Sequence, residues 1–142
     1  MPERDPLEIA AGALRHRDRS RREVDERLER AGVADEARAE TLEALERLGY
    51  VDDARYAAAR AATLAGRGRG DAAIRHDLEQ RGVEGELVEG ALAALEPEAG
   101  RARALVQRLG ATPGTAARLA RNGFAPESVE AAVGAEIAGD GA

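Results

Sequence analysis

Residues 71–95, DAAIRHDLEQRGVEGELVEGALAAL, decide the fold of this chain. Ile74 and Leu78 lie one helical turn apart before Gly82, and Leu92 lies on the apolar spacing that follows. Glycine favours a helix end because it turns with a positive φ at little steric cost. The stretch therefore predicts two helices joined by a glycine turn.

The same unit is present three times in the chain. Aligning the sequence on Gly32, Gly82 and Gly123 places a Leu four residues before each glycine, an apolar residue directly after it and another ten residues on. These residues are Leu28, Leu78, Leu119, Val33, Val83, Phe124, Leu42, Leu92 and Val133. Because repeats of this kind indicate a tandem array, we expect the Leu and the post-glycine residue to pack inside each unit.

The whole chain is predicted to be all-α, because no segment alternates apolar and polar residues with a period of two. We expect a tandem array of three three-helix modules, about nine helices in total, with an elongated or curved shape. The modules are predicted at residues 1–49, 50–97 and 98–138, with a frayed tail at 139–142. Such arrays present long surfaces and are usually binding devices and seldom enzymes.

Helix start and stop signals set the limits of the expected helices. These are 6–17, 20–32, 35–48, 53–65, 71–82, one helix that stops at Pro97, 98–109, 112–123 and a last helix from 126. Ser20 and Glu23 have the spacing of a capping box. Asp53 and Asp71 are predicted to be N-caps of their helices.

Composition argues against an enzyme. The chain is 44% hydrophobic but has one Phe, two Tyr and no Trp, which suits closely packed helices better than a large ligand pocket. It has no Cys and no Lys, which excludes Cys-ligated zinc, thiol catalysis, a Walker-type phosphate loop and Schiff-base chemistry. His16 and His76 are far apart and expected to be solvated. We therefore expect no catalytic residue, no metal and no cofactor.

The few aromatic residues leave two interpretations open. Tyr50 and Tyr56 could stack against nucleic-acid bases. With so few aromatics in the chain, they could instead fill the core at a module junction, which is the favoured interpretation. Phe124 is likewise expected in the core.

The location of the chain follows from two expected absences. No apolar run approaches the roughly 20 residues that cross a membrane. The opening residues MPERD lack the basic and then apolar pattern of a signal peptide. We expect a cytoplasmic protein that does not bind membranes.

Charge alternates in blocks along the chain, although the net charge is −6. Basic stretches at 15–22, 54–70 and 99–126 are separated by acidic ones. These blocks are either ordinary solvated faces or patches that meet a polyanion or an acidic protein groove. The candidate partner-binding residues are Arg15, Arg17, Arg19, Arg21, Arg22, Arg55, Arg60, Arg67, Arg69, Arg101, Arg103, Arg108, Arg118 and Arg121. Arg67 and Arg69 are expected on a flexible glycine-rich loop at 66–70, from which they could reach phosphates or acidic side chains.

Residues 48–57, LGYVDDARYA, and the basic-Gly-aliphatic end of the helix at 81–83 resemble the central signature of the bacterial RecX regulatory proteins. The segment 17–28, with its Ser-x-x-Glu pattern, is similar to the opening helix of that family, and 121–124 resembles its third repeat. The resemblance extends from about residue 14 to residue 133.

This resemblance implies a mode of action. RecX proteins modulate the RecA recombinase, and they look like helical arrays that lie in the groove of the RecA–DNA filament. The resemblance therefore implies that the chain limits filament growth, ATP hydrolysis, strand exchange and co-protease activity, or that it tunes RecA more subtly, as in some family members. We expect a monomer with at most weak binding to DNA phosphates. The alternative is a helix-turn-helix DNA-binding protein, with residues 115–133 as the reading unit. Against it, the second helix of that unit carries three acids and no Arg.

Overall fold

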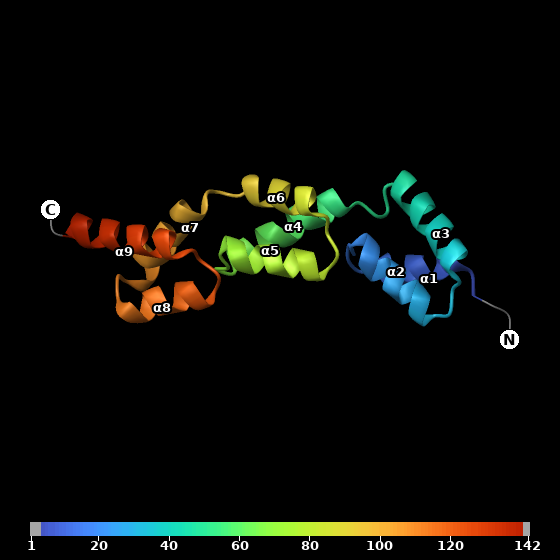
Figure 1. The fold of residues 1–142 in the computed structure, drawn as a ribbon, viewed down its shortest axis with the longest axis horizontal. Helices are drawn as coiled ribbons and strands as arrows, with labels where there is room; N and C mark the ends of the chain where they lie inside the picture. Colours follow the sequence, from blue (N-terminus) through green and yellow to red (C-terminus); the bar gives the residue numbers. More distant parts are fainter. Residues whose placement is uncertain (1–3, 141–142) are drawn as a thin grey trace.

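The computed structural model describes residues 4–140 and contains nine α-helices and no strand within that range. The helices are α1 (Pro6–Leu14), α2 (Arg21–Arg30), α3 (Asp35–Arg47), α4 (Asp53–Gly66), α5 (Asp71–Gln80), α6 (Gly85–Ala93), α7 (Glu98–Leu109), α8 (Pro113–Arg121) and α9 (Pro126–Asp140). They form three groups of three that follow one another along one axis (Figure 1). The all-α prediction is confirmed.

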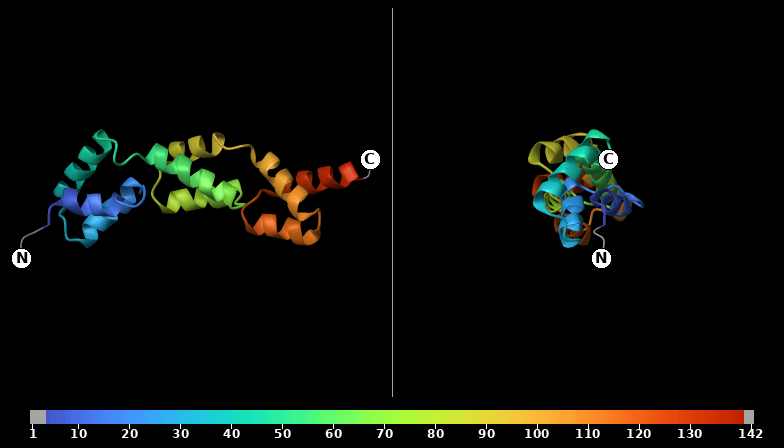
Figure 2. Two further views of the ribbon diagram at one scale, coloured as in Figure 1. Left: turned by 180° about the vertical axis from the view of Figure 1, so that it is seen from behind. Right: turned by 90° about the vertical axis from the view of Figure 1, so that its right-hand side faces the viewer.

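The array is elongated. In Figure 2, the view along the long axis superimposes the three groups, so the array has little sideways bend. All the substantial helix–helix packing in the described residues lies within a triplet: α1 to α3, α4 to α6, or α7 to α9. Neighbouring modules therefore touch only over small areas, and a few contacts at each joint must set their relative position.

Each triplet encloses a separate hydrophobic cluster, as the repeat predicts. Leu28, Leu78 and Leu119 are 0%, 0% and 1% exposed, so the repeat leucines are the centres of the three cores. The post-glycine residues Val83 and Phe124 are also buried. The three repeat glycines all have positive φ, between 82° and 92°.

The module limits predicted from the sequence stay a prediction, and one linker residue lies close to such a limit. Val51 is 2% exposed and packs with the cluster of the first triplet, although it follows the predicted end of that module. The predicted frayed tail begins too early, because α9 continues through Asp140. Residues 141 and 142 lie outside the described residues.

The caps agree with the sequence at some helices and differ at others. Ser20 and Glu23 form the expected capping box, and Thr112 caps α8. Asp52, and not Asp53, caps α4, and Gly70, and not Asp71, precedes α5 without a side-chain cap. Asp53 and Asp71 are instead the first residues of their helices, where their carboxylates accept hydrogen bonds from a neighbouring module: Asp53 from the Arg21 amide and Asp71 from the Arg101 guanidinium.

Some predicted helices are longer than those observed. The first ends at Leu14 and not at residue 17, and α6 ends at Ala93, before Pro97. The chain leaves the helix after Leu14, and the Arg19 side chain donates to the carbonyl of Ala13 in the last turn of α1.

The two tyrosines have different environments. Tyr56 is 5% exposed and belongs to the core of the middle triplet, which confirms the prediction for this residue. Tyr50 is 61% exposed, so its prediction as a core residue is wrong. Its amide donates to the carbonyl of Leu45 in the turn after α3, and the residue that follows it, Val51, is buried in its place.

In the described part of the chain, no helix combines the length and the apolar character needed to cross a membrane.

Candidate partner-binding surface

A basic hollow of about 440 Å³ lies on the middle module, between the end of α4 and one face of α5. Its lining includes the guanidinium groups of Arg60, Arg67, Arg69 and Arg81 and the single carboxylate of Asp77. Four positive charges against one negative charge make this hollow attractive to an anionic partner, although the chain as a whole is acidic.

The loop that carries Arg67 and Arg69 is tied down by its backbone, in contrast to the flexible loop expected from its glycines. The amides of Gly68 and Arg69 donate to carbonyls in the last turns of α4, at 3.0 and 3.1 Å. The amide of Gly70 donates to the carbonyl of Asn122 in the third module, at 2.8 Å. Both arginine side chains are exposed, so the loop presents them to solvent from a fixed backbone.

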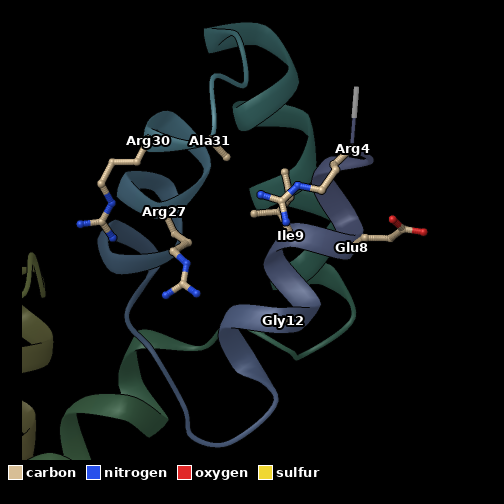
Figure 3. Close-up of a pocket in the computed structure, with 7 residues that line it drawn as sticks. All are labelled: Arg4, Glu8, Ile9, Gly12, Arg27, Arg30 and Ala31. Atoms are coloured by element: carbon tan, nitrogen blue, oxygen red, sulfur yellow. The ribbon is translucent and has the colours of Figure 1, made fainter. Parts of the chain in front are cut away.

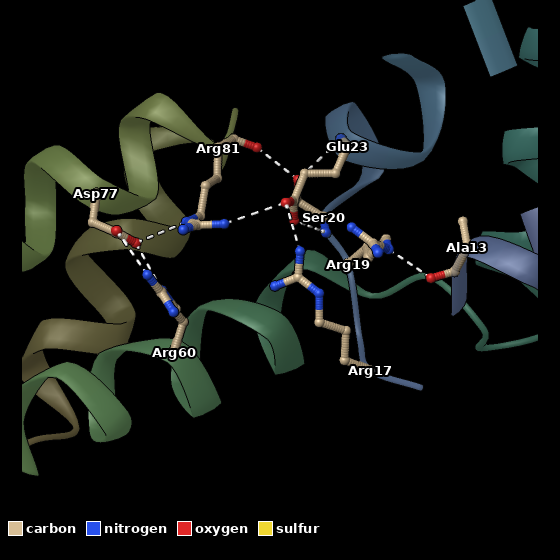
Figure 4. Close-up of polar contacts among 8 residues, drawn as sticks. All are labelled: Ala13, Arg17, Arg19, Ser20, Glu23, Arg60, Asp77 and Arg81. Atoms are coloured by element: carbon tan, nitrogen blue, oxygen red, sulfur yellow. Dashed lines mark hydrogen bonds and ion pairs between the residues drawn. The ribbon is translucent and has the colours of Figure 1, made fainter. Parts of the chain in front are cut away.

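The inner wall of the hollow is a network of ion pairs that continues into the first module (Figure 4). Asp77 accepts from Arg60 at 2.9 and 3.0 Å and from Arg81 at 3.0 Å. Arg81 also pairs with Glu23 at 3.2 Å, and Arg17 approaches Glu23 to 3.8 Å. Arg60 and Arg81 are therefore held by their acids. At the rim, Arg67 and Arg69 form no ion pair with another described residue, and Arg69 donates to the side-chain oxygen of Asn122 at 3.2 Å.

The two acids of this network have lowered pKa values. The hydrogen bond from Arg60, helped by the charge of Arg81, holds the pKa of Asp77 below its ordinary value. Burial acts to raise the pKa of Glu23, but the hydrogen bond from the Ser20 amide and the nearby arginine charges outweigh it. Both carboxylates are therefore ionised at neutral pH, which keeps the network charged.

The structure separates the 14 predicted arginines into two groups. Six form an ion pair or donate to a backbone carbonyl within the chain: Arg17, Arg19, Arg21, Arg55, Arg60 and Arg101. Eight are exposed and form no ion pair with another described residue: Arg15, Arg22, Arg67, Arg69, Arg103, Arg108, Arg118 and Arg121. A count of charges along the sequence cannot distinguish these groups, because the acidic partners come from other helices and other modules.

Arg101 and Arg55 are examples of the arginines that form ion pairs within the chain. The side chain of Arg101 is only 10% exposed, pairs with Asp71 at 2.9 Å and lies 5.8 Å from the centre of the Phe124 ring. Arg55 donates to both oxygens of Asp18, at 3.0 and 3.3 Å, and so links the first two modules. These guanidinium groups hold the array together and are poorly placed to bind a partner.

A second basic hollow, of about 510 Å³, was not predicted from the sequence (Figure 3). Arg4, Arg27 and Arg30 line it above the apolar side chain of Ile9, and Figure 3 shows Glu8 turned away from it. The three-residue spacing of Arg27 and Arg30 on one helix was the signal that could have indicated this cluster. It gives the first module an anion-attracting surface outside the predicted set.

Residues 4–140 contain no group of three or more His, Asp or Glu side chains arranged to hold a metal ion. His16 and His76 are exposed, as expected. The arginines that line the two basic hollows can donate charge-assisted hydrogen bonds.

Comparison with known proteins agrees with the three-helix modules that the repeat predicts. Residues 52–92, which span α4 to most of α6, match the family described as "RecX, second three-helix domain". Two curated proteins, both named "Regulatory protein RecX", from Xanthomonas axonopodis pv. citri (strain 306) and Xanthomonas citri, are 34% identical over 140 residues. Each alignment covers 92% of this chain and 86% of the relative. This chain belongs to the RecX family.

Solved RecX structures share the fold. The crystal structure of RecX from Lactobacillus salivarius is 18% identical in sequence, with a TM-score of 0.79 over 90% of this chain and 92% of that one. A second structure, titled "Crystal structure of regulatory protein RecX", is 22% identical, with a TM-score of 0.75 over 88% of this chain and 69% of that one. The RecX fold is thus preserved at low sequence identity, and the curated relatives are named as regulatory proteins.

Proposed function

We propose that this RecX-family chain binds the RecA nucleoprotein filament and modulates it, mostly by inhibiting its ATPase, strand-exchange and co-protease activities. Membership of a family of regulatory proteins carries the proposal. The surface supports it, because exposed arginines lie on all three modules of an elongated array.

A repetitive partner suits this distribution of charge. Each module offers a small basic area, and an isolated contact of that size would bind weakly and be screened by salt. Contacts on a continuous array act together, because the first one raises the effective concentration of the others. A filament presents the same surface at regular intervals, so several modules can engage it at once.

The middle module is the proposed centre of this contact. Its basic hollow brings together Arg67 and Arg69 at the rim with Arg60 and Arg81 in the wall. The rim arginines can form charge-assisted hydrogen bonds with carboxylates or phosphates without breaking an ion pair within the described chain. The wall arginines add positive potential but are already hydrogen-bonded to acids.

A titration of RecA ATP hydrolysis on single-stranded DNA tests the proposal. Added chain should slow hydrolysis at substoichiometric ratios, because in this proposal one array engages several filament subunits at once. Co-sedimentation with filaments should show binding over the same concentration range. Unchanged hydrolysis at saturating chain, with no co-sedimentation, would refute the proposal.

Nothing in the structure favours the helix-turn-helix alternative. Its reading helix would be α9, which carries Glu127, Glu130 and Glu136 and no Arg, so DNA phosphates would repel it. We therefore expect binding to bare DNA to be weak and strongly dependent on salt. Nanomolar binding at ~0.2 M salt would support the alternative instead.

A further inference from the structure

The two joints between modules share the same hydrogen bond. The helix that opens the second module begins with Asp53, and the helix that opens the third begins with Glu98. Asp53 accepts from the backbone amide of Arg21 at 2.8 Å, and Glu98 accepts from that of Asp71 at 2.7 Å. In both joints the donor is the first residue of the second helix of the preceding module.

This bond satisfies groups that a helix leaves open. The first four amides of an α-helix have no partner within the helix, and the helix dipole places positive charge at that end. A carboxylate there is stabilising. At α5, which has no side-chain cap of its own, the next module supplies it, and at α2 the carboxylate of the next module adds to the capping box of Ser20 and Glu23. The acid therefore acts across the joint as a cap for the neighbouring helix.

A second contact also recurs at both joints. Ser20 and Gly70 each lie twelve residues before the repeat glycine of their module. The Ser20 hydroxyl donates to the carbonyl of Arg81 at 2.6 Å, and the Gly70 amide donates to that of Asn122 at 2.8 Å. Each accepting carbonyl belongs to the residue before the repeat glycine of the next module. The glycine turn of one module is thus hydrogen-bonded to the residue that precedes the second helix of the preceding module.

The surroundings of the repeat glycines also show that neighbouring modules approach each other closely. A Cβ added to Gly82 would lie 2.6 Å from the Cβ of Arg22, and one added to Gly123 would lie 2.6 Å from the Cβ of Ala73. A Cβ added to Gly32 would meet nothing within 4 Å. The glycines that face a preceding module are therefore tightly packed, whereas the first is open.

Proline occupies the two outer positions that correspond to the joint residues. Pro6 is the first residue of α1, where the other modules have Asp53 and Glu98, and it has no carboxylate. Pro113 is the first residue of α8, where the other modules donate a backbone amide, and it has no N–H. Neither position can form this joint, so the bond is specific to the two interior junctions.

We propose that Asp53 and Glu98 are positioning residues that set the spacing and tilt of neighbouring modules. Among the described helices, no two from different modules pack extensively, so the polar contacts at each joint hold the basic surfaces of successive modules in one register, and these acids provide the bond that both joints share. The consequence for binding rests on the proposed function, since a repetitive partner can be engaged by several modules only if their spacing fits its own.

The two acids use their carboxylate oxygens differently, so amide substitutions should affect the two joints differently. Asp53 receives one hydrogen bond, on one oxygen, and burial raises the pKa of its carboxyl. An asparagine could keep that bond. Glu98 receives the Asp71 amide on one oxygen and the Ala125 amide on the other, at 2.7 and 2.8 Å. A glutamine has only one acceptor oxygen, so one of these amides would face an NH₂ group.

Distances between spin labels test the joints directly. The chain has no cysteine, so only introduced thiols are labelled. Cysteines at Glu40 and Glu86, both exposed, report the first joint, and cysteines at Glu86 and Glu130 report the second. The measured quantity is the distance distribution in the full chain by electron–electron double resonance, with circular dichroism to confirm that each variant is helical.

We expect each substitution to affect one joint only. Asp53→Ala should broaden or shift the first distance and leave the second unchanged, while Asp53→Asn should alter neither. Glu98→Gln should broaden or shift the second distance and leave the first unchanged. Glu127→Gln, which removes an exposed acid at the start of α9, is the matched control and should alter neither. Distributions unchanged by both Asp53→Ala and Glu98→Gln would overturn the proposal.

Filament binding by the same variants tests the functional consequence. Asp53→Ala and Glu98→Gln should bind RecA filaments about tenfold more weakly than the parent, because avidity is lost when modules leave register. Altered distances with undiminished affinity would overturn that consequence. If the parent itself does not bind filaments while the distances change as expected, the joint assignment stands and the proposed function fails.

Discussion

Two alanine substitutions at equivalent glycines should have different effects on stability. Gly32 and Gly82 occupy the same place in the repeat and have φ values of 85° and 82°. An alanine in this left-handed region costs about 1–2 kcal/mol wherever it is placed. That cost is therefore common to Gly32→Ala and Gly82→Ala, and their difference isolates the contact between modules.

The contact should make Gly82→Ala clearly worse. Its new methyl group would lie 2.6 Å from the Cβ of Arg22, whereas carbon atoms pack at about 3.5–4.0 Å. Because that atom is fixed to the backbone of α2, a change of rotamer cannot move it away. Relief requires α2 and α5 to separate by about 1 Å, and forced overpacking of this kind costs about 1–3 kcal/mol. The Gly32 methyl group meets no atom and adds no such cost.

Urea unfolding followed by circular dichroism measures this difference, and the spin-label distance across the first joint locates it. We expect Gly82→Ala to lose about 1–3 kcal/mol more than Gly32→Ala and to broaden or lengthen that distance. Gly32→Ala should leave the distance as in the parent. Equal losses of stability with identical distance distributions would refute the reasoning, since the joint would then tolerate the methyl group.

Three further results are expected. Arg67→Glu should reduce filament binding several-fold without loss of helix content, because it reverses a charge at the rim of the basic hollow. Arg47→Glu, which changes an exposed arginine outside that hollow, should have little effect. Equal effects of the two substitutions in co-sedimentation would show that the hollow is irrelevant. Leu78→Ala should cost about 2–5 kcal/mol in urea unfolding, because this side chain is fully buried at the centre of the middle module; a loss below about 1 kcal/mol would contradict its central place in the core. Acid should destabilise the chain, because the pKa values of Glu23 and Glu98 are lowered in the folded state. Their stabilisation is present above the ordinary glutamate pKa of about 4.3 and is lost as the pH falls through the folded pKa values. A melting temperature that does not depend on pH between about 5 and 3 would contradict their contribution.

Much of the fold could be predicted from local rules. Capping residues, glycine stops and the four-residue spacing before Gly32, Gly82 and Gly123 depend on neighbours in sequence, so they specify helices and triplets without any long-range information. The observed helix boundaries differ from the predicted ones where a residue contacts another module. Asp53 was predicted to cap its own helix because acids favour that position, but it stands one residue further on and accepts the amide of Arg21 from another module.

The candidate surface was only partly predictable, for a related reason. The sequence identified blocks rich in arginine, but it could not show which guanidinium groups meet a carboxylate from another helix. Arg60 and Arg101 looked like partner-binding residues and are instead paired with Asp77 and Asp71. The scarcity of aromatic residues favours a core position for Tyr50 as well, although its side chain is exposed.

The sequence by itself determined the helices, their grouping around repeat leucines and the scarcity of chemistry other than that of arginine, because these follow from residue type and local spacing. The tertiary structure decided which arginines remain available and how each module is held against the next. Those features depend on a few hydrogen bonds between residues more than 20 positions apart, such as Arg21 with Asp53 and Asp71 with Glu98. No local pattern encodes such bonds, since the same acid at a helix start could equally have remained in solvent.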